Sequence, residues 1–406
     1  MKPLLSIVVT SYTMDRFKDI CDLFDSIKSQ TILTQPQTLS PQSKVLSPKS
    51  PDTGRRTSDI GHLLEVIFVA ERSRELYQKV KEFISRQSTV ASPQPPPPEP
   101  QSEVIGSKSA QKVAGQQSSV KPFAADLQAH DYQTSDSQRP ETIDCGLLTY
   151  RLLFNDGEPG LSAARNLGIK HARGDIIAFV DDDVVLFPNW AEEVVKSFDD
   201  DSIIGVTGPA LPLWEDEKLM SWFPEEFYWI ISCTAWFDCD EKREVRNAWG
   251  MNMAFKKEAF EKGELFSVHF GLRNSSRLGW IDPPSEDVDL SLRIKEKTGK
   301  KIIFNPNIKV RHRVYRRRIG LRFVIQRAAS VGFQRRALKN LYPRLKSNGN
   351  LLGQEHQLLK RIFTRLPPEM LKDFVRNPAI ACRKLWVVLV ALLSVAFGYY
   401  FPSRRA

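Results

Sequence analysis

Three consecutive carboxylates, Asp181, Asp182 and Asp183, follow the apolar run Asp175–Val180. The run is short and contains mainly Ile, Phe and Val, which is typical of a buried strand. Ligands of open α/β sheets bind at the carboxyl ends of such strands. Carboxylates this close together repel one another, and a divalent cation relieves the repulsion. The cluster therefore predicts a divalent metal that holds a phosphorylated ligand.

A second acidic pair, Glu286 and Asp287, lies in the segment SEDVDLSLRI and begins a predicted helix. Ser285 suits the N-cap position, and the helix dipole favours acids in the first turn. A capping role alone would account for these residues. A carboxylate placed beside a hydroxyl group can also act as a general base, so the residues by themselves leave both interpretations open.

Short apolar runs alternate with amphipathic stretches in the parts of the chain that surround these acids. This alternation predicts an α/β fold, with a largely parallel sheet that helices cover on both faces. Strands are expected at Leu5–Thr10, Leu64–Val69, Leu147–Phe154, Asp175–Val180, Ile203–Ala210 and Lys301–Val310. Helices are expected at Phe17–Gln30, Glu71–Ser85, Leu161–Ala172, Pro188–Phe198 and Glu286–Lys297.

Two polar segments, 31–60 and 87–143, interrupt this alternation. Both are rich in Pro, Ser, Gln and Thr, and the second contains the run PQPPPPEP. Such a composition buries too little apolar surface to offset the entropy of the chain. We therefore expect two disordered insertions that interrupt loops of the fold.

A basic block extends from Lys297 to Gln354. It contains sixteen Lys or Arg residues and no Asp or Glu, a surplus larger than the net charge of +10 of the whole chain. Charge of this sign and density attracts nucleic acid, diphosphates or anionic lipid. A solvated charged face is the alternative. The stretch Gly320–Arg365 is expected to be helical, and to pack across the domain or lie on a membrane surface.

The segment Leu385–Phe401 contains seventeen residues without a charge. Arg383 and Lys384 precede it, and aromatic residues lie near both of its ends. This length is at the lower limit for a spanning helix, and the flanking residues suit a membrane interface. The pattern predicts a membrane anchor at 385–401, and a buried terminal helix is the alternative.

The five cysteines are scattered and show neither the spacing of a metal site nor the density of a disulfide framework. They are expected to be small buried hydrophobic residues in a reducing compartment. The apolar opening of the chain is short and lacks a small-residue cleavage site, so it predicts a first strand and no secretory signal.

Four motifs occur in a specific order: TSY at 10–12, GLSAARNLGI at 160–169, FVDDD at 179–183 and SEDVDLSLRI at 285–294. Together they resemble the family 2 glycosyltransferases of the GT-A fold. The resemblance covers residues 3–315 without the two insertions. Three further segments are similar to archaeal glucosyl-dolichyl-phosphate glucuronosyltransferases. These are TSYTMDR at 10–16, PEEFYWII at 224–231 and VRNAWGMNMAFKKE at 245–258.

The resemblance implies a catalytic GT-A domain at 1–315, a basic helical extension at 316–384 and a membrane anchor at 385–401. The acidic cluster corresponds to the DxD motif of the family. Asp183 and Asp181 are then expected to bind Mg²⁺ or Mn²⁺, and Asp181 or Asp182 to meet the hydroxyls of the ribose or sugar. Some GT-A enzymes use a His at the place of His312 as a further metal ligand.

Other roles follow from the same resemblance. Asp287 is expected to be the general base, and Glu286 to help place the acceptor. The nucleotide pocket is expected beside Thr10 and Tyr12, with Arg165 near the base or the diphosphate. Glu71 is the nearest equivalent of the Asp with which the family reads uracil, because the chain has VAERS in place of a DGS-like turn. Arg311, Arg313 and the run 316–318 suit a lipid phosphate or pyrophosphate.

The sequence therefore predicts an inverting, metal-dependent transferase. It would move a sugar, with glucuronic acid as a candidate, from a nucleotide-sugar donor, most simply UDP-linked, to a dolichyl- or polyprenyl-phosphate-linked sugar in glycan or N-glycan assembly. Its catalytic domain is expected in the cytoplasm, bound to anionic membrane lipid.

Two alternatives differ from this reading. One is a synthase that glycosylates the lipid phosphate directly, and the other is a nucleic-acid-binding protein that uses the basic block. Aromatic residues are sparse in that block, so no nucleic-acid partner is expected.

Overall fold

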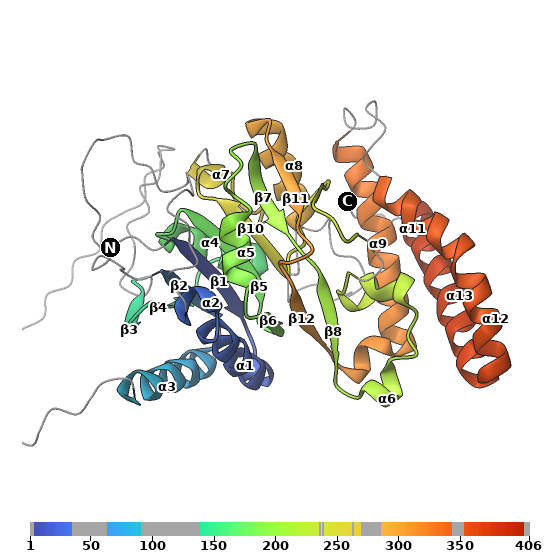
Figure 1. Ribbon diagram of the computed structural model, residues 1–406, viewed down its shortest axis with the longest axis horizontal. Helices are drawn as coiled ribbons and strands as arrows, with labels where there is room; N and C mark the ends of the chain where they lie inside the picture. Colours follow the sequence, from blue (N-terminus) through green and yellow to red (C-terminus); the bar gives the residue numbers. More distant parts are fainter. Residues whose placement is uncertain are drawn as a thin grey trace, which may run out of the picture.

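A computed structural model describes residues 4–34, 63–90, 139–234, 237, 239–261, 264–268, 286–342 and 353–401. Within these ranges the protein has a large central sheet with helices on both faces, a small second sheet, and a helical layer at the C-terminal end (Figure 1). The predicted α/β class is confirmed. Most of the two predicted insertions lies outside the described residues.

The central sheet has nine strands in the order β3-β4-β2-β1-β5-β10-β7-β11-β9. Strands β4, β2, β1 and β5 pair in parallel, whereas β10 is antiparallel to both β5 and β7. The bounds are β1 Leu5–Ser11, β2 Leu64–Glu71, β3 Glu141–Cys145, β4 Leu148–Asn155, β5 Ile176–Asp181, β7 Ile203–Thr207, β9 Arg243–Glu244, β10 Asn252–Lys256 and β11 Lys301–Phe304. The parallel group brings the carboxyl ends of β1, β2 and β5 to one edge, as expected for a ligand-binding α/β sheet.

The predicted single strands Ile203–Ala210 and Lys301–Val310 are wrong, because each divides into two. Strand β7 is followed by Gly208 and Pro209 and then by β8 (Ala210–Trp214), and β11 is followed by the turn 305–309 and then by β12 (Val310–Val314). A Cβ placed on Gly208 would lie 2.0 Å from the carbonyl oxygen of Ile308. The two bends therefore pack backbone against backbone, which requires a glycine at this point.

Strands β8 and β12 form the second sheet together with β6 (Val184–Leu186), in the order β6-β12-β8. In this sheet His312 of β12 is paired with Val184 of β6. Val184 directly follows Asp183 in the sequence. The division of the two predicted strands is thus what brings His312 to the acidic cluster.

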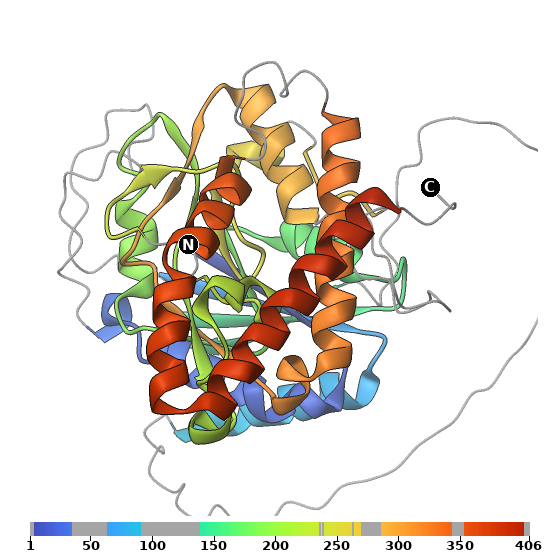
Figure 2. The same ribbon diagram turned by 90° about the vertical axis from the view of Figure 1, so that its right-hand side faces the viewer.

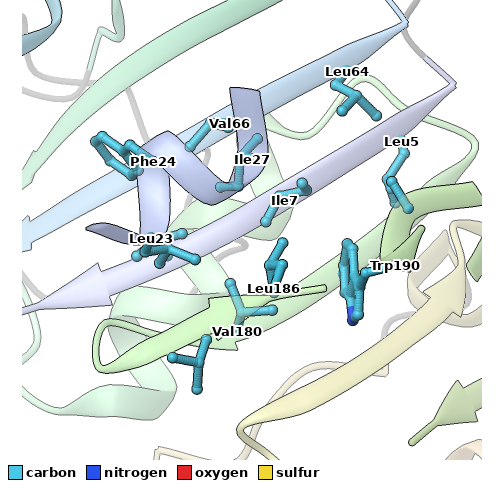
Figure 3. Packing of buried hydrophobic residues seen from close by; sticks show 14 of the residues in the cluster. Leu5, Ile7, Leu23, Phe24, Ile27, Leu64, Val66, Val180, Leu186 and Trp190 are labelled. Atoms are coloured by element: carbon cyan, nitrogen blue, oxygen red, sulfur yellow. The ribbon is translucent and has the colours of Figure 1, made fainter. Parts of the chain in front are cut away.

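Helices cover both faces of the central sheet because its strands are apolar on both sides. In β1, Leu5, Ile7 and Val9 belong to one core cluster, whereas Val8 belongs to the cluster on the other face, as the two-residue period of a strand requires. Figure 3 shows Leu23, Phe24 and Ile27 of the first helix above β1 and β2, with Trp190 nearby. The helices are α1 Phe17–Lys28, α2 Thr31–Thr34, α3 Arg74–Val90, α4 Leu161–His171, α5 Trp190–Lys196, α6 Glu217–Met220, α7 Glu258–Glu261 and α8 Glu286–Thr298.

The two predicted insertions contain some regular structure at their ends. Helix α2 lies at the start of the first, and α3 continues to Val90 inside the second. Strand β3 begins at Glu141, also inside the second, and forms a hairpin with β4. Gly146 has a φ of 79° in the turn between β3 and β4, a conformation that favours glycine.

The C-terminal part is helical: α9 Leu321–Leu341, α11 Gly353–Thr364, α12 Leu366–Arg376 and α13 Pro378–Tyr400. The described residues before α9 include three short 3₁₀ helices, η1 Met14–Arg16, η6 Glu225–Ile231 and η7 Arg316–Ile319. Helix α13 contains the predicted apolar segment and is long and apolar enough to cross a membrane. Figure 2 shows that α13 runs across the front of this end of the molecule, over α9.

Candidate active site

The acidic cluster lies where β5 ends. Asp181 is the last residue of β5, and Asp182 and Asp183 form the turn that leads into β6. This turn lets Asp181 and Asp183 face the same region, together with His312 of β12. One ligand atom from each of these three side chains lies within 4.8 Å of the other two. The nearest approach between Asp183 and His312 is 3.3 Å, from Oδ1 to Nε2.

Two arginines from distant segments contact Asp183. Arg16 Nη1 lies 3.2 Å from Oδ2, and Arg318 Nη2 lies 2.9 Å from the same oxygen. Burial alone would raise the pKa of Asp183, but the interaction with His312 and the positive charges of Arg318 and Arg16 hold that pKa below its ordinary value. Asp183 is therefore a buried, ionised carboxylate around which positive charge gathers.

The pKa of Asp182 is shifted in the opposite direction to that of Asp183. Burial, and then the charge of Asp183, raise the pKa of Asp182 to about 7. Its nearest described cation is Arg16, whose Nε is 3.8 Å from Oδ1. Neighbouring carboxylates are thus driven to different pKa values by their surroundings, as occurs at functional sites.

The donors at this cluster suit a divalent metal. Carboxylate oxygens suit Mg²⁺ and Mn²⁺, and an imidazole nitrogen favours a transition ion. Burial lowers the pKa of His312, against the opposing charge of Asp183, so the neutral ring that a metal requires is favoured. Asp183 and His312 are almost completely buried, whereas the side chain of Asp181 is 35% exposed. The residues present therefore fit a cation that is reached from the side of Asp181.

Arg165 joins this cluster to the second acidic pair. It lies on α4 and is buried, with Nη2 3.1 Å from Asp181 Oδ1 and Nη1 2.9 Å from Glu286 Oε1. The same guanidinium donates a hydrogen bond of 3.1 Å to the carbonyl of Gly250. A planar guanidinium holds several acceptors in a fixed arrangement, so Arg165 sets the separation of the two acidic groups.

The second acidic pair lies in the first turn of α8. The amide of Gly250 donates to Asp287 Oδ2 at 2.9 Å, which orients this carboxylate. The pKa of Glu286 is raised, mainly by burial. The charge of Asp287 adds to this increase, and the charge of Arg165 opposes it. The predicted N-cap Ser285 lies outside the described residues.

The residues predicted to bind the nucleotide lie along the same edge of the sheet. Thr10 is paired with Val69 of β2 and Asp181 of β5. The side chain of Tyr12 is 57% exposed. Glu71 is buried, and its Oε1 accepts a 2.7 Å hydrogen bond from the amide of Gly160 at the start of α4. Glu71 therefore has a structural contact of its own, whatever it binds.

Sequence reasoning did not single out Arg16 or Gly250, and it assigned Arg318 to a lipid phosphate. Arg16 ends the TSYTMDR segment, so its place just after the first strand was a usable signal. The contact of Arg318 with Asp183 joins residues that lie far apart in the chain, and no local pattern indicates it. Arg318 Nη1 also lies 3.4 Å from both ring nitrogens of His312.

Comparisons with known proteins find similar sequences and a similar fold. Residues 148–263 match the sequence model of glycosyl transferase family 2. The chain is 28% identical over 249 residues to the glucosyl-dolichyl phosphate glucuronosyltransferase of Haloferax volcanii. The aligned residues make up 61% of this chain and 76% of that protein. The structure of the mannosyltransferase PcManGT from Pyrobaculum calidifontis, solved in complex with GDP-Man and Mn²⁺, matches this fold with a TM-score of 0.50 at 15% sequence identity. The match covers 99% of this chain and 88% of the PcManGT chain. The structural likeness confirms the expected fold.

Proposed function

Since the chain carries a glycosyltransferase family 2 domain on a GT-A fold, we propose that this glycosyltransferase transfers a sugar, with inversion, from a nucleotide-sugar donor to a dolichyl- or polyprenyl-phosphate-linked sugar. The observation that carries the proposal is the pair of acidic groups that Arg165 holds at a set separation. A UDP-linked donor and glucuronic acid are the first candidates, because the Haloferax relative is a glucuronosyltransferase.

The donor end is the cluster of Asp181, Asp183 and His312, which would hold Mg²⁺ or Mn²⁺. When bound, the cation neutralises the charge that develops on the departing diphosphate. Arg16 and Arg318 bring two guanidinium groups to the same place, and these groups suit phosphate oxygens. Asp182, Thr10 and Tyr12, together with Glu71 at the end of β2, would bind the nucleotide at this edge of the sheet.

The acceptor end is Asp287, with Glu286 beside it. One carboxylate oxygen of Asp287 is held by the Gly250 amide, so the side chain is oriented before a substrate arrives. The acceptor hydroxyl gives its proton to this carboxylate as its oxygen attacks the anomeric carbon. Attack from the face opposite the leaving diphosphate inverts the configuration. Glu286, paired with Arg165, helps to place the acceptor.

Association with a membrane is part of the proposal, because a dolichyl-linked acceptor is a lipid. The C-terminal helix α13 is long and apolar enough to cross a membrane. The basic block adds attraction to anionic lipid. We place the catalytic domain in the cytoplasm.

The direct test incubates membranes that contain the full chain with a panel of nucleotide sugars and with glucosyl-dolichyl phosphate as the acceptor. Transfer of one sugar is expected with Mn²⁺ or Mg²⁺, and EDTA is expected to abolish it. If no donor is consumed in the presence of either ion, the proposed function is wrong.

Substitution of Asp287 by Asn tests the role of the base. The rate of transfer should fall by about 10²- to 10⁴-fold, because a general base contributes that much. Glu296→Gln on the exposed side of α8 is the matched control and should leave the rate unchanged. Near-normal transfer by Asp287→Asn would favour the synthase alternative, because a lipid phosphate is already ionised.

A further inference from the structure

Helix α13 has two different faces. One consists mainly of small buried residues that pack against α9, among them Ala391 and Gly398. The other is apolar and uncovered, with side chains that are 46–70% exposed. It consists of Leu385, Trp386, Leu389, Leu393, Phe397 and Tyr400. A continuous exposed apolar face of this kind marks an interaction surface.

The neighbouring helices also carry exposed apolar residues. Helix α12 packs against α13, and both belong to the outer layer at one end of the molecule (Figures 1 and 2). The exposed apolar residues of α11 and α12 are Leu359, Phe363, Leu371, Phe374 and Val375, at 41–81% exposure. We call the exposed apolar residues of α11, α12 and α13 the docking face.

Helix α13 lies directly against α9 along much of its length. A Cβ placed on Gly332 would lie 2.0 Å from the carbonyl oxygen of Val395, and one on Gly398 would lie 1.9 Å from that of Ala329. The two helices therefore pack backbone to backbone at two points. Arg336 Nη1 also donates a 3.0 Å hydrogen bond to the carbonyl oxygen of Tyr399 near the end of α13. This packing holds α9 and α13 together, so α13 cannot enter a membrane without α9 unless the two helices separate.

This packing makes a spanning position of α13 energetically costly. A helix of 23 residues is roughly 34 Å long, about the thickness of the hydrocarbon core. If α13 crossed that core, α9 would enter it too, with the basic residues Arg322, Arg327, Arg335, Arg336 and Lys339. Each Arg or Lys costs about 2.5–3.5 kcal/mol at the centre of a bilayer. Crossing would therefore require either these insertions or the separation of two closely packed helices.

We propose that the docking face lies in the surface of a lipid bilayer, so that α13 rests along the membrane and does not cross it. Charge favours an anionic bilayer, because residues 353–401 contain seven Lys or Arg and three Asp or Glu. Trp386 and Tyr400 suit the boundary between headgroups and acyl chains. This arrangement rests on the proposed function, in which the acceptor is a lipid.

The docking face is connected to the site through a short path. Helix α9 follows η7 directly, and η7 carries Arg318, which contacts Asp183. A bilayer bound at α13 is thereby held in a set orientation relative to Asp181, Asp183 and His312. The lipid-linked acceptor then reaches the active site from the membrane surface on which α13 lies.

The topology of the C-terminus is the first test. The full chain, with a protease-cleavable tag after residue 406, is bound to sealed phosphatidylglycerol vesicles from the outside. Added protease should remove the tag without detergent. A tag that is protected until detergent is added means that α13 crosses the bilayer, and this overturns the proposal.

Vesicle flotation is the second test. The double variant Leu393→Glu and Phe397→Glu should bind phosphatidylglycerol vesicles about tenfold less than the unmodified chain, because charge is placed in the apolar face. Leu219→Glu is the matched control, since Leu219 on α6 is 56% exposed but lies outside the docking face. Equal flotation of the double variant and the control contradicts the proposal.

A soluble acceptor separates this proposal from the proposed function. The double variant should still transfer sugar to a short-chain, water-soluble acceptor, and its thermal unfolding should match that of the control. If the unmodified chain fails with every acceptor but still floats with vesicles, the proposed function is wrong and the docking face stands.

Discussion

Buried charges lie at both ends of the central strands, and they are held in different ways. At the amino end, Glu65 of β2 accepts hydrogen bonds from Ser6 and from the amides of Arg173 and Gly174, the last two at 2.5 and 3.3 Å. Arg151 is nearby, at 3.8 Å. A Cβ on Gly174 would lie 2.7 Å from the amide nitrogen of Ser6. This carboxylate is thus built into a tight closure of the backbone.

At the carboxyl end, the charged partners of Asp183 are side chains. Arg16 and Arg318 reach it on long, flexible stems from segments that are distant in sequence. Such partners can turn toward a phosphate when a metal takes their place at the carboxylate. The comparison teaches that a buried carboxylate bound by backbone amides serves the fold, whereas one bound by arginine side chains can exchange its partners.

The largest expected effect is on catalysis at the carboxyl end. Asp183→Asn should lower the rate of sugar transfer by about a thousand-fold, because the metal loses a charged ligand while the side chain keeps its shape. Binding of Mn²⁺, followed by electron paramagnetic resonance, should weaken in parallel. Asp201→Asn is the control, since Asp201 is exposed. Transfer within tenfold of the unmodified rate would contradict a metal-binding role for Asp183.

The next effect is on stability at the amino end. Glu65→Ala should lower the free energy of unfolding by about 3 kcal/mol, because the buried Arg151 and two backbone amides lose their acceptor. Denaturant unfolding measures the loss, and Glu75→Ala on exposed α3 should change it by less than about 0.5 kcal/mol. Similar losses in both variants would show that the amino-end cluster is not structural.

The smallest effect concerns the partners of Asp183. Arg318→Ala should increase the affinity of the nucleotide-free protein for Mn²⁺ by about tenfold, because a competing positive charge is removed from Asp183. The same variant should transfer sugar more slowly. Arg316→Ala is the control, since Arg316 pairs with Asp216 away from the cluster. Weaker binding of Mn²⁺ by Arg318→Ala would show that this arginine supports the metal site and does not compete with it.

Much of the site was predictable because its motifs are local. An apolar strand followed by three acids predicted a cluster at a strand end, and the structure places Asp181 and Asp183 there together with His312. The roles of these residues stay predictions. The division of two expected strands was not predictable, because the close approach of Gly208 to Ile308 depends on how two bends meet.

By itself the sequence determined the alternation of strands and helices, the acidic groups and the apolar C-terminal segment, because each of these is a pattern within a short stretch of the chain. Only the tertiary structure decided that Arg165 joins the two acidic groups, that Arg16 and Arg318 share Asp183, and that α13 is bound to α9 on one side. These contacts join residues that are far apart in the chain. Their geometry follows from the packing of whole elements, which no local pattern specifies.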